Sequence, residues 1–472
     1  MKLIVEEKIK IVYFAGCKIT QQVYILPNGE FITFENSLYS TIFRKIIMVT
    51  AIVVGAGHRA EIYASLAKVI PDKFKIVGVA DLDPLRRRKI RETYGFSEDM
   101  CFSSSEELMK REKLADVIIN GTMDTDHVPT TVPMLEKGYD VLLEKPFAVS
   151  NEEVDILAEA VKRTGRKVMI CHVLRYAPFY LKIKELLKSG AIGEIINIHT
   201  TEHVSYHHAA NCFIRGKWRR KDLSGTSMFV QKCCHDMDLI CWFMSGVAPV
   251  KVSSFGSRSF FTPEHAPEGS GEYCLDECPY EHTCDYSCRK LNLEHLNRWD
   301  PYVWREIEHI ENPTMADYEK ELRRKDNPYA KCIWKGDNDV VDRQSVMIEF
   351  ASGVTATHNM VAGTSRGCRK IHIIGSTGEI EGVMNDNSFV LRHIDVGNEY
   401  KDEIINLNDE GDTTGAFGGH GGGDMRLVMD FYELVSGKTP SISCTLLEDS
   451  LNSHRLAFAA DEAMESGKVV LF

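Results

Sequence analysis

The sequence predicts a two-domain α/β protein, in which a parallel-sheet domain precedes an α+β domain with a largely antiparallel open sheet. Three observations support this prediction. An apolar run over residues 49–54 ends in a glycine turn and leads directly into a helical pattern. From there to about residue 175, apolar runs alternate with amphipathic helices. Beyond residue 178, strand-like segments follow one another. We therefore expect domains at 48–175 and 176–472.

The first domain should contain a parallel sheet with helices on both faces, because apolar runs that alternate with amphipathic helices are typical of that arrangement. Ligands of such sheets bind at the carboxyl ends of the strands. The expected strands are 50–54, 75–81, 116–121, 140–144 and 167–173, and the expected helices are 59–70, 84–94, 105–112, 126–137 and 150–164.

The second domain should be built mainly from antiparallel strands, since short connections containing Gly353 and Gly378 indicate neighbouring strand pairs. Residues 258–340 interrupt this pattern with charge, tryptophan and cysteine, and we expect an insertion there. The expected strands are 194–204, 249–257, 343–350, 353–361, 369–375, 378–383 and 388–394, with helices at 178–188, 225–245, 424–436 and 446–466.

Residues 1–47 precede the first strand of the predicted core. The segment 22–32 resembles a β-hairpin around Asn28-Gly29. One interpretation is an accessory hairpin or dimer arm. The other is an upstream extension, for example from a start codon assigned too early. The sequence favours the extension, because little of this segment has the periodicity needed to build a core.

Composition excludes several classes of function. The 472-residue chain carries a formal net charge of −12 and has no long basic run, so a nucleic-acid partner is not expected. No stretch approaches the ~20 apolar residues of a membrane span. The N-terminus lacks the pattern of a signal peptide. Without such a signal, the 14 cysteines indicate reduced thiols and a cytoplasmic protein.

The glycine turn Gly55-Ala56-Gly57-His58-Arg59-Ala60 matches the G-x-G-x-x-A pattern of Rossmann dinucleotide-binding units. In that pattern the first glycine permits the turn, the second lets a pyrophosphate approach the backbone, and the small third residue lets the helix lie close to the strand. The pattern alone is weak evidence. It becomes specific when the next strand ends in an acid about 20 residues later. Asp81 provides that acid.

Asp81 also favours NAD over NADP, because a carboxylate can accept hydrogen bonds from both ribose hydroxyls and repels a 2′-phosphate. The arginines at 86–88 are the evidence against this, since they could turn toward a phosphate. The predicted cofactor-binding residues of this region are Gly55, Ala56, Gly57, His58, Arg59 and Asp81.

A second motif, Glu144-Lys145-Pro146, follows a buried strand and includes a proline that can hold a cis peptide bond. Taken alone, this motif would indicate only a surface lysine beside a turn. Together with the glycine turn and the T-x-x-x-x-H segment Thr122–His127, it resembles the Gfo/Idh/MocA oxidoreductases, the family of glucose–fructose oxidoreductase and inositol dehydrogenase. The resemblance extends from about Met48 to the C-terminus. It implies that Thr122, His127, Glu144 and Lys145 lie at the cofactor, with Lys145 beside nicotinamide and substrate.

A partly desolvated ammonium such as that of Lys145 can hold or pass a hydroxyl proton. A helix near 225–245 adds Gln231, His235 and Asp238 on one face and resembles the family's D-x-x-x-H-x-x-D helix. We expect His235 to transfer the hydroxyl proton, the alternative being a histidine inside a buried polar network. Gln231 departs from the family pattern because glutamine cannot act as a base. Lys232, about 100° around the helix, is the candidate replacement.

The resemblance also places substrate contacts after the last parallel strand, where Arg175-Tyr176 matches the family's R-[FY] pair. Tyrosine and tryptophan stack on sugars, and arginine binds hydroxyls. The histidines at 203, 207 and 208 could be metal ligands instead, but no carboxylate or cysteine stands at ligand spacing. The glycine-rich loop at 418–424, with Asp424 as helix N-cap, is either a substrate loop or a linker. The predicted substrate residues are Arg175, Tyr176, Tyr206, Arg215, Trp218, Lys232 and Asp238.

The insertion contains four cysteines in the pattern C-x3-C-x5-C-x3-C, namely Cys274, Cys278, Cys284 and Cys288. Four thiolates at this spacing can surround one tetrahedral ion. Zinc is the leading metal, an iron–sulfur cluster is a further possibility, and reduced thiols without a metal are the alternative.

These features predict an NAD-dependent oxidoreductase that acts on a secondary hydroxyl of a sugar, cyclitol or glycoside. Two alternatives stay open. One is a glycoside hydrolase that recycles NAD through oxidation and elimination. Gln231, in place of the family's aspartate, is the reason for keeping this alternative. The other is a non-enzymatic nucleotide-sensing regulator, which the presence of Lys145 and His235 disfavours. The resemblance further implies a homo-oligomer, dimer or tetramer, formed through the second-domain sheet.

Overall fold

The computed structural model describes residues 10–12, 23–25, 31–33, 48–407 and 422–472, and the chain divides into two compact units, Met1–Met48 and Val49–Phe472. The first unit contains one antiparallel sheet of order β1-β2-β3. β2 and β3 pair with Val23 opposite Thr33, as the hairpin prediction requires, while Asn28-Gly29 lies outside the described residues. The strands are β1 (Lys10–Val12), β2 (Val23–Ile25) and β3 (Phe31–Thr33).

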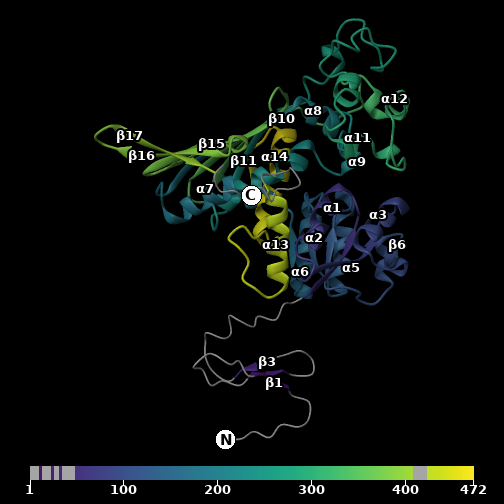
Figure 1. Ribbon diagram of the computed structural model, residues 1–472. Helices are drawn as coiled ribbons and strands as arrows, with labels where there is room; N and C mark the ends of the chain where they lie inside the picture. The colour runs from purple at the N-terminus through teal and green to yellow at the C-terminus, as the bar shows by residue number, and fades with distance from the viewer. Residues whose placement is uncertain (1–9, 13–22, 26–30, 34–47, 408–421) are drawn as a thin grey trace, which may run out of the picture. The chain divides into compact units, whose positions relative to one another are not determined.

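The second unit begins with a six-stranded parallel sheet of order β6-β5-β4-β7-β8-β9 (Figure 1). Its apolar side chains are buried on both faces, as expected for a sheet covered by helices. Five of its strands were predicted. The sixth, β6, has two residues and is too short to show periodicity. The strands are β4 (Val49–Val54), β5 (Phe74–Ala80), β6 (Cys101–Phe102), β7 (Val117–Asn120), β8 (Asp140–Leu143) and β9 (Val168–Ile170).

The helices between these strands follow the predicted order, with one break. The predicted helix 59–70 divides at Ser65, whose hydroxyl donates to the carbonyl of Ile62 at 2.6 Å. Such bonds back to the preceding turn compete with helix propagation. The elements are α1 (His58–Ala64), α2 (Leu66–Val69), α3 (Pro84–Tyr94), η1 (Glu98–Met100), α4 (Ser105–Met109), η2 (Asp124–Asp126), α5 (His127–Glu136), α6 (Asn151–Thr164) and η3 (Val173–Tyr176).

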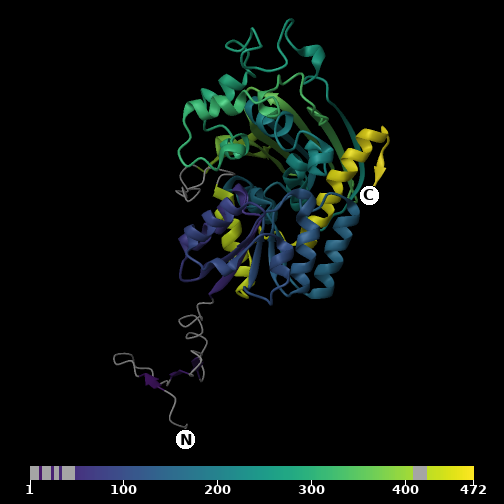
Figure 2. The same ribbon diagram turned by 90° about the vertical axis from the view of Figure 1, so that its right-hand side faces the viewer.

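A nine-stranded open sheet of order β17-β16-β15-β14-β10-β13-β12-β11-β18 forms the second half of this unit (Figure 2). Only β10 and β13 pair in parallel, which confirms the predicted fold class. The sequence missed β18 and β17; almost all side chains of β17 are exposed, so it has no apolar alternation to detect. The strands are β10 (Ile195–Ser205), β11 (Pro249–Ser257), β12 (Arg343–Phe350), β13 (Thr355–Thr364), β14 (Cys368–Gly375), β15 (Gly378–Val383), β16 (Ser388–Asp395), β17 (Glu399–Asn406) and β18 (Val470–Leu471).

Helices α10 and α14 pack against one face of this sheet, and their apolar residues share one core with its strands. α10 is buried over nearly its whole length, so its polar residues must find partners inside the protein. The helical elements here are α7 (Pro178–Ser189), α8 (Tyr206–His208), η4 (Ala209–Ile214), α9 (Lys221–Ser224), α10 (Met228–Phe243), η9 (Met384–Asp386) and α14 (Leu447–Ser466).

Helix α13 (Gly423–Val435) packs on the parallel sheet, although it lies near the C-terminus: Leu427 and Phe431 belong to the same core as Val53. The prediction that Asp424 caps this helix is wrong. Gly422 is the N-cap because its φ of 82° lies in the left-handed region that glycine adopts without strain, and Asp424 falls in the first turn.

The predicted insertion connects β11 to β12, two neighbouring strands, and has a small core of its own. Cys274, Cys288, Trp304 and Ile307 are among its buried residues. Its helical elements are η5 (Pro263–His265), η6 (Arg289–Leu293), α11 (Asp300–Val303), η7 (Arg305–Ile307), α12 (Met315–Leu322) and η8 (Pro328–Ala330). Within the described ranges, no helix is long and apolar enough to cross a membrane.

Candidate active site

The glycine turn after β4 has the shape that a bound dinucleotide requires. Gly55 has φ of 73°, and a Cβ there would lie 2.6 Å from the backbone nitrogen of Thr122. A Cβ on Gly121 would lie 2.9 Å from that of Ala60, which shows how closely α1 approaches the sheet. At Gly57, by contrast, the nearest atom to an added Cβ is 4.0 Å away. The backbone at Gly57 is therefore open, and the turn fits a pyrophosphate.

Asp81 follows β5 and is held against this turn. Its carboxylate accepts hydrogen bonds from the backbone nitrogens of Ala56, at 2.6 Å, and Asp83, at 2.8 Å. The carboxylate thus stands at the carboxyl edge of the sheet beside the glycine turn, where an acid in a Rossmann unit meets the adenosine ribose.

A buried ionic cluster lies next to the turn and supports Lys145. The Glu144 carboxylate accepts from Arg59 Nε at 2.9 Å and from the Tyr63 hydroxyl at 2.6 Å. Arg59 also pairs with Asp424. Although burial opposes it, the charges of Arg59 and Lys145 hold the pKa of Glu144 below its ordinary value. The side chains of Arg59 and Glu144 bind each other, and their predicted place at the cofactor stays a prediction.

Lys145 is fixed between this cluster and α10. Its backbone nitrogen donates to Glu144 at 2.7 Å, and its Nζ donates to the carbonyl oxygen of Gln231 at 3.0 Å. The Gln231 amide instead donates to the Thr226 hydroxyl at 2.8 Å. The contact between Lys145 and residue 231 therefore involves only the backbone of that residue, and the departure from the family's aspartate does not remove it.

The T-x-x-x-x-H segment is connected to the same loop. His127 is buried, and its Nδ1 lies 2.7 Å from the carbonyl oxygen of Pro146, which follows a cis peptide bond. The Thr122 hydroxyl donates to the Asn120 side chain at 2.9 Å. His127 thus holds the loop that carries Lys145 and is fully buried, and its predicted place at the cofactor stays a prediction.

Two buried histidine rings lie behind Lys145. His235 of α10 and His172, which follows β9, meet edge to face with ring centroids 5.6 Å apart. Burial lowers the pKa of His172 to about 4, so its ring is neutral at physiological pH. The sequence predicted no role for His172. The structure brings it to the predicted proton-transfer residue.

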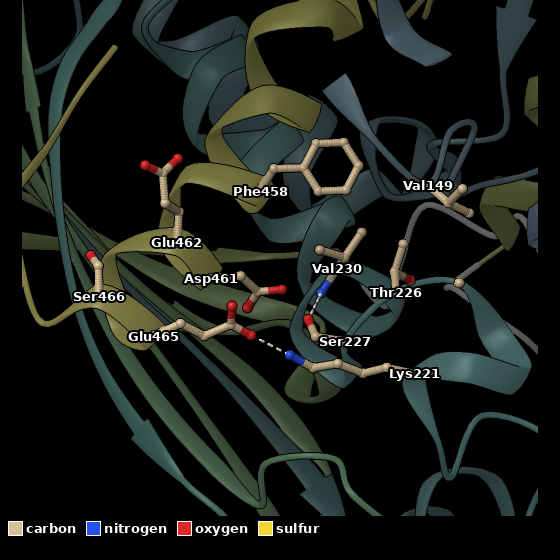
Figure 3. Close-up of a pocket in the computed structure, with 11 residues that line it drawn as sticks. Val149, Lys221, Thr226, Ser227, Val230, Phe458, Asp461, Glu462, Glu465 and Ser466 are labelled. Atoms are coloured by element: carbon tan, nitrogen blue, oxygen red, sulfur yellow. Dashed lines mark hydrogen bonds and ion pairs between the residues drawn. The ribbon is translucent and has the colours of Figure 1, made fainter. Parts of the chain in front are cut away.

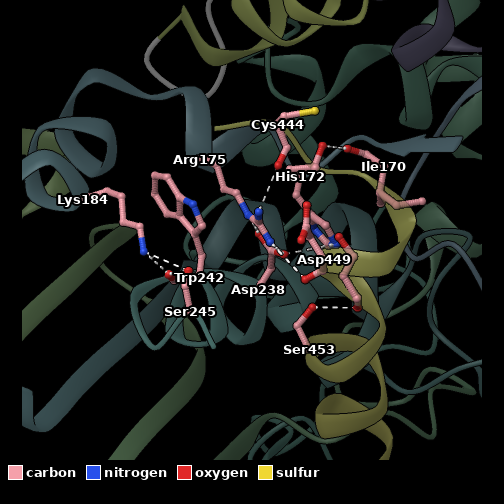
Figure 4. Close-up of polar contacts among 12 residues, drawn as sticks. Ile170, His172, Arg175, Lys184, Asp238, Trp242, Ser245, Cys444, Asp449 and Ser453 are labelled. Carbon is pink, nitrogen blue, oxygen red and sulfur yellow. Dashed lines mark hydrogen bonds and ion pairs between the residues drawn. The ribbon is translucent and has the colours of Figure 1, made fainter. Parts of the chain in front are cut away.

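Arg175 and Asp238 form a buried ion pair beside His172, whose Nε2 lies 3.9 Å from Asp238 (Figure 4). The guanidinium donates from Nε at 2.7 Å and from Nη2 at 2.6 Å to the two carboxylate oxygens. The residues are 2% and 1% exposed. The Tyr176 hydroxyl donates to Asp430 at 2.8 Å. All three residues that were predicted to contact a sugar, Arg175, Tyr176 and Asp238, are buried and bind partners within the protein, and a role in substrate binding stays a prediction.

Arg215, another predicted substrate residue, also binds groups within the protein. It is buried beside the insertion, where its Nε donates to the carbonyl of Lys331 at 2.9 Å and its Nη2 to that of Tyr286 at 3.0 Å. The arginine therefore anchors the insertion. The Lys232 Nζ, 3.1 Å from Glu202, is also paired within the protein, but its side chain is only partly buried.

Aromatic side chains line the region beyond Lys145. The Trp218 indole donates to Asp124 at 3.1 Å and lies 5.4 Å from the Tyr302 ring. The insertion also supplies Trp299, which stacks on His208 at 3.8 Å between ring centroids. Arg298 Nη1 donates a hydrogen bond to the Tyr206 hydroxyl at 3.2 Å. Of this group the sequence predicted Trp218 and Tyr206. It missed Trp299 and Tyr302, whose only signal was the aromatic content of the insertion.

Two family models match consecutive parts of the chain. The model for an oxidoreductase family with an NAD-binding Rossmann fold matches residues 49–172, and that for the family's C-terminal alpha/beta domain matches residues 184–472. The chain belongs to the Gfo/Idh/MocA oxidoreductase family. Membership confirms the predicted enzyme class, an oxidoreductase acting on CH–OH groups, and an NAD-binding Rossmann domain.

Other members of the Gfo/Idh/MocA family are similar over most of the chain. An oxidoreductase named YteT from Bacillus subtilis is 27% identical over 409 residues, which cover 82% of this chain and 89% of the relative. A crystal structure of an Agrobacterium radiobacter oxidoreductase in complex with NAD+, L-tartaric acid and magnesium has a TM-score of 0.63 at 13% identity, covering 90% of this chain and 98% of that one. Myo-inositol 2-dehydrogenase from Lactobacillus plantarum has a TM-score of 0.59 at 17% identity, covering 90% and 99%.

Three of the four cysteines of the insertion, Cys274, Cys278 and Cys284, line one small cavity together with Cys332. Within the described ranges, the one set of three His, Cys, Asp or Glu ligand atoms lying within 4.8 Å of one another is Cys233, Asp236 and His358, and there Asp236 pairs with Arg369. Cys274 instead accepts from Arg215 Nη2 at 3.4 Å and lies beside Cys288 in the apolar core of the insertion. The zinc or iron–sulfur site at the four cysteines stays a prediction. The one set of three ligand atoms in the described part of the chain does not include His203, His207 or His208.

A further cavity lies away from these residues. It has a volume of about 540 Å³ and is lined by Ser227, Phe458 and Asp461, with the Lys221–Glu465 ion pair at its rim (Figure 3). Burial raises the pKa of Asp461 to about 6. None of the predicted cofactor or catalytic residues lines it. We therefore do not assign this cavity as the active site, despite its volume.

Proposed function

We propose that this Gfo/Idh/MocA protein is an NAD-dependent oxidoreductase for a secondary hydroxyl of a sugar, cyclitol or glycoside. The observation that carries the proposal is the position of Lys145. It stands at the carboxyl edge of the parallel sheet, fixed by Glu144 and by the carbonyl of Gln231, near the buried His172–His235 pair. The names of relatives support this substrate class, since they include inositol 2-dehydrogenases.

Lys145 and His235 have different roles toward the substrate hydroxyl. One of the three Lys145 N–H donors is used on Gln231, and a second can donate to the substrate oxygen and stabilise negative charge there. His235, held against the neutral His172 ring, takes the hydroxyl proton at a ring nitrogen. When bound, the cofactor would supply the acceptor for the hydride that leaves the carbon bearing this hydroxyl.

The aromatic wall gives the carbohydrate a surface to lie on. Trp218 and Tyr302 are only partly buried and lie 5.4 Å apart, and aromatic rings stack on the apolar faces of sugars. Lys217 lies 4.3 Å above the Trp218 ring, and burial lowers its pKa. The wall therefore combines stacking surface with one cationic donor that can bind substrate hydroxyls.

We propose NAD rather than NADP as the cofactor, since the carboxylate of Asp81 is fixed beside the glycine turn, where it disfavours a 2′-phosphate. We also propose a cytoplasmic homo-oligomer formed through the sheet face opposite α10 and α14. That face exposes Phe255 and Met347 on neighbouring strands, and large exposed apolar side chains in one area mark interfaces.

A panel of free sugars, cyclitols and glycosides, incubated with NAD while reduced cofactor and released aglycone are followed, tests this proposal. Lys145→Met keeps the length of the side chain but removes the ammonium, so turnover should vanish while NAD still binds. Lys188→Met, at the exposed end of α7, is the matched control and should leave turnover unchanged. Turnover by the Lys145 variant at the wild-type rate would refute the proposal.

A further inference from the structure

A cavity of about 300 Å³ lies beside the glycine turn and is closed on one side by the insertion. Gly57 and Arg86 line it from the parallel-sheet domain, and Trp304, Ile307 and Glu308 line it from the insertion. Figure 1 shows the segment that carries α11 close to α1 and α3. Because adenosine binds a Rossmann unit between the glycine turn and the acid that ends the second strand, this cavity lies in the adenosine half of the site.

The insertion presents a rigid wall to this cavity. Trp304 and Ile307 belong to the core of the insertion, and the Trp304 ring lies 4.5 Å from that of Tyr318. Tyr302 meets His58 of the glycine turn edge to face at 6.2 Å. The apolar side of the cavity is thus supported from behind by packed side chains.

An ion pair joins the insertion to α3 at the rim. Arg86 Nη2 lies 2.9 Å from Glu308 Oε2, and Arg86 Nε lies 3.8 Å from Asp83. The charges of Glu308, Asp81 and Asp83 all act on this guanidinium and raise its pKa, although partial burial opposes them. Arg86 therefore stands among three carboxylates.

The other basic groups at the start of α3 are also engaged. Arg87 donates to the backbone carbonyl of Asp81, and Lys89 pairs with Glu61 at 2.8 Å. Arg88 is exposed and lies 3.8 Å from Glu92. Two of the three arginines that could have bound a 2′-phosphate, Arg86 and Arg87, are thus held by acceptors of the protein, and Glu308 holds the one that lines the cavity.

We propose that the insertion completes the adenosine pocket and that Glu308 is a coenzyme-specificity residue, which keeps Arg86 from binding the 2′-phosphate of NADP. The inference rests on the proposed NAD-dependent function and adds a residue far from the glycine turn in sequence. A neutral 2′-hydroxyl tolerates three nearby carboxylates, whereas a phosphate carries up to two negative charges and is repelled by them. Without Glu308, the fork of Arg86 becomes available for bidentate phosphate binding.

Calorimetric titration of the full chain with NAD and with NADP, without carbohydrate, tests the specificity role. Glu308→Ala should tighten NADP binding about tenfold or more, the change expected for one charge-assisted contact, and leave the Kd for NAD within about threefold. Glu306→Ala, in the same segment but with an exposed side chain that does not line the cavity, is the matched control and should change neither value. Adding Arg86→Gln to Glu308→Ala should abolish the gain.

Hydrogen exchange tests the pocket itself. ADP-ribose should slow amide exchange over residues 300–308 of the wild type, and nicotinamide mononucleotide should not. Unchanged NADP affinity in Glu308→Ala, an equal gain in Glu306→Ala, or no protection by ADP-ribose would overturn the inference. Absence of turnover on every carbohydrate would refute the proposed function instead, and these binding results do not depend on it.

Discussion

Breaking the buried Arg175–Asp238 pair should destabilise the protein far more than breaking an exposed pair. Asp238→Asn removes one charge and leaves a guanidinium that is 2% exposed without its counter-ion. Loss of one partner of a buried pair costs about 3–5 kcal/mol. Arg175 keeps two backbone acceptors, the carbonyls of Cys444 at 3.2 Å and Asp449 at 3.5 Å, so we expect a loss near the lower end, about 3 kcal/mol.

Urea unfolding of the full chain measures this loss as a fall in the midpoint. Arg220→Met is the control, because the Arg220–Asp222 pair lies at the surface and should contribute about 0–1 kcal/mol. The double variant Arg175→Met/Asp238→Leu should recover part of the stability lost in Asp238→Asn, since it leaves no buried charge behind. If Asp238→Asn unfolds no earlier than the surface control, the assignment of this pair to the structural core is refuted.

Three further predictions concern separate parts of the molecule. His235→Ala should lower kcat by about 10²–10⁴-fold while NAD still binds, as steady-state kinetics and titration would show; an unchanged kcat would exclude it as the proton acceptor. Deleting residues 1–47 should leave the melting temperature of the remainder nearly unchanged, because Val49–Phe472 forms a compact unit of its own. Asp461→Asn should stabilise the protein above pH 6 by on the order of 1–3 kcal/mol and have no effect below about pH 4. The reason is that burial raises the pKa of this carboxyl to about 6, so the folded protein is more stable with the carboxyl protonated. A gain in stability at pH 4 equal to that at pH 7 would contradict this.

Elements with strong local signals were predictable. The glycine turn at Gly55, the acid at Asp81 and the alternation of strands and helices are encoded within short windows, and the structure has the parallel sheet where the sequence placed it. β6 and β17 were missed for the opposite reason. β6 is too short, and β17 too exposed, to show a periodic pattern of apolar residues in the sequence.

Side-chain roles were less predictable, because a motif does not show which partners a residue meets after folding. Arg175 and Tyr176 have the residue types of a sugar site, but Asp238 and Asp430, more than 60 positions away, bind them. The same applies to the cysteines at 274 and 288, whose spacing suits a metal although they pack in a small apolar core. Conversely, Glu308 has no motif, and only tertiary contact brings it to Arg86.

The measurement that tests the central claim most directly is the ratio of reduced cofactor formed to substrate consumed, determined in deuterium oxide with the first carbohydrate that is turned over. The account predicts one NADH for each substrate molecule, with no deuterium at the carbon next to the oxidised one. Turnover with only catalytic NAD, no net NADH and a deuterated product would contradict it and would establish a redox-elimination glycosidase instead.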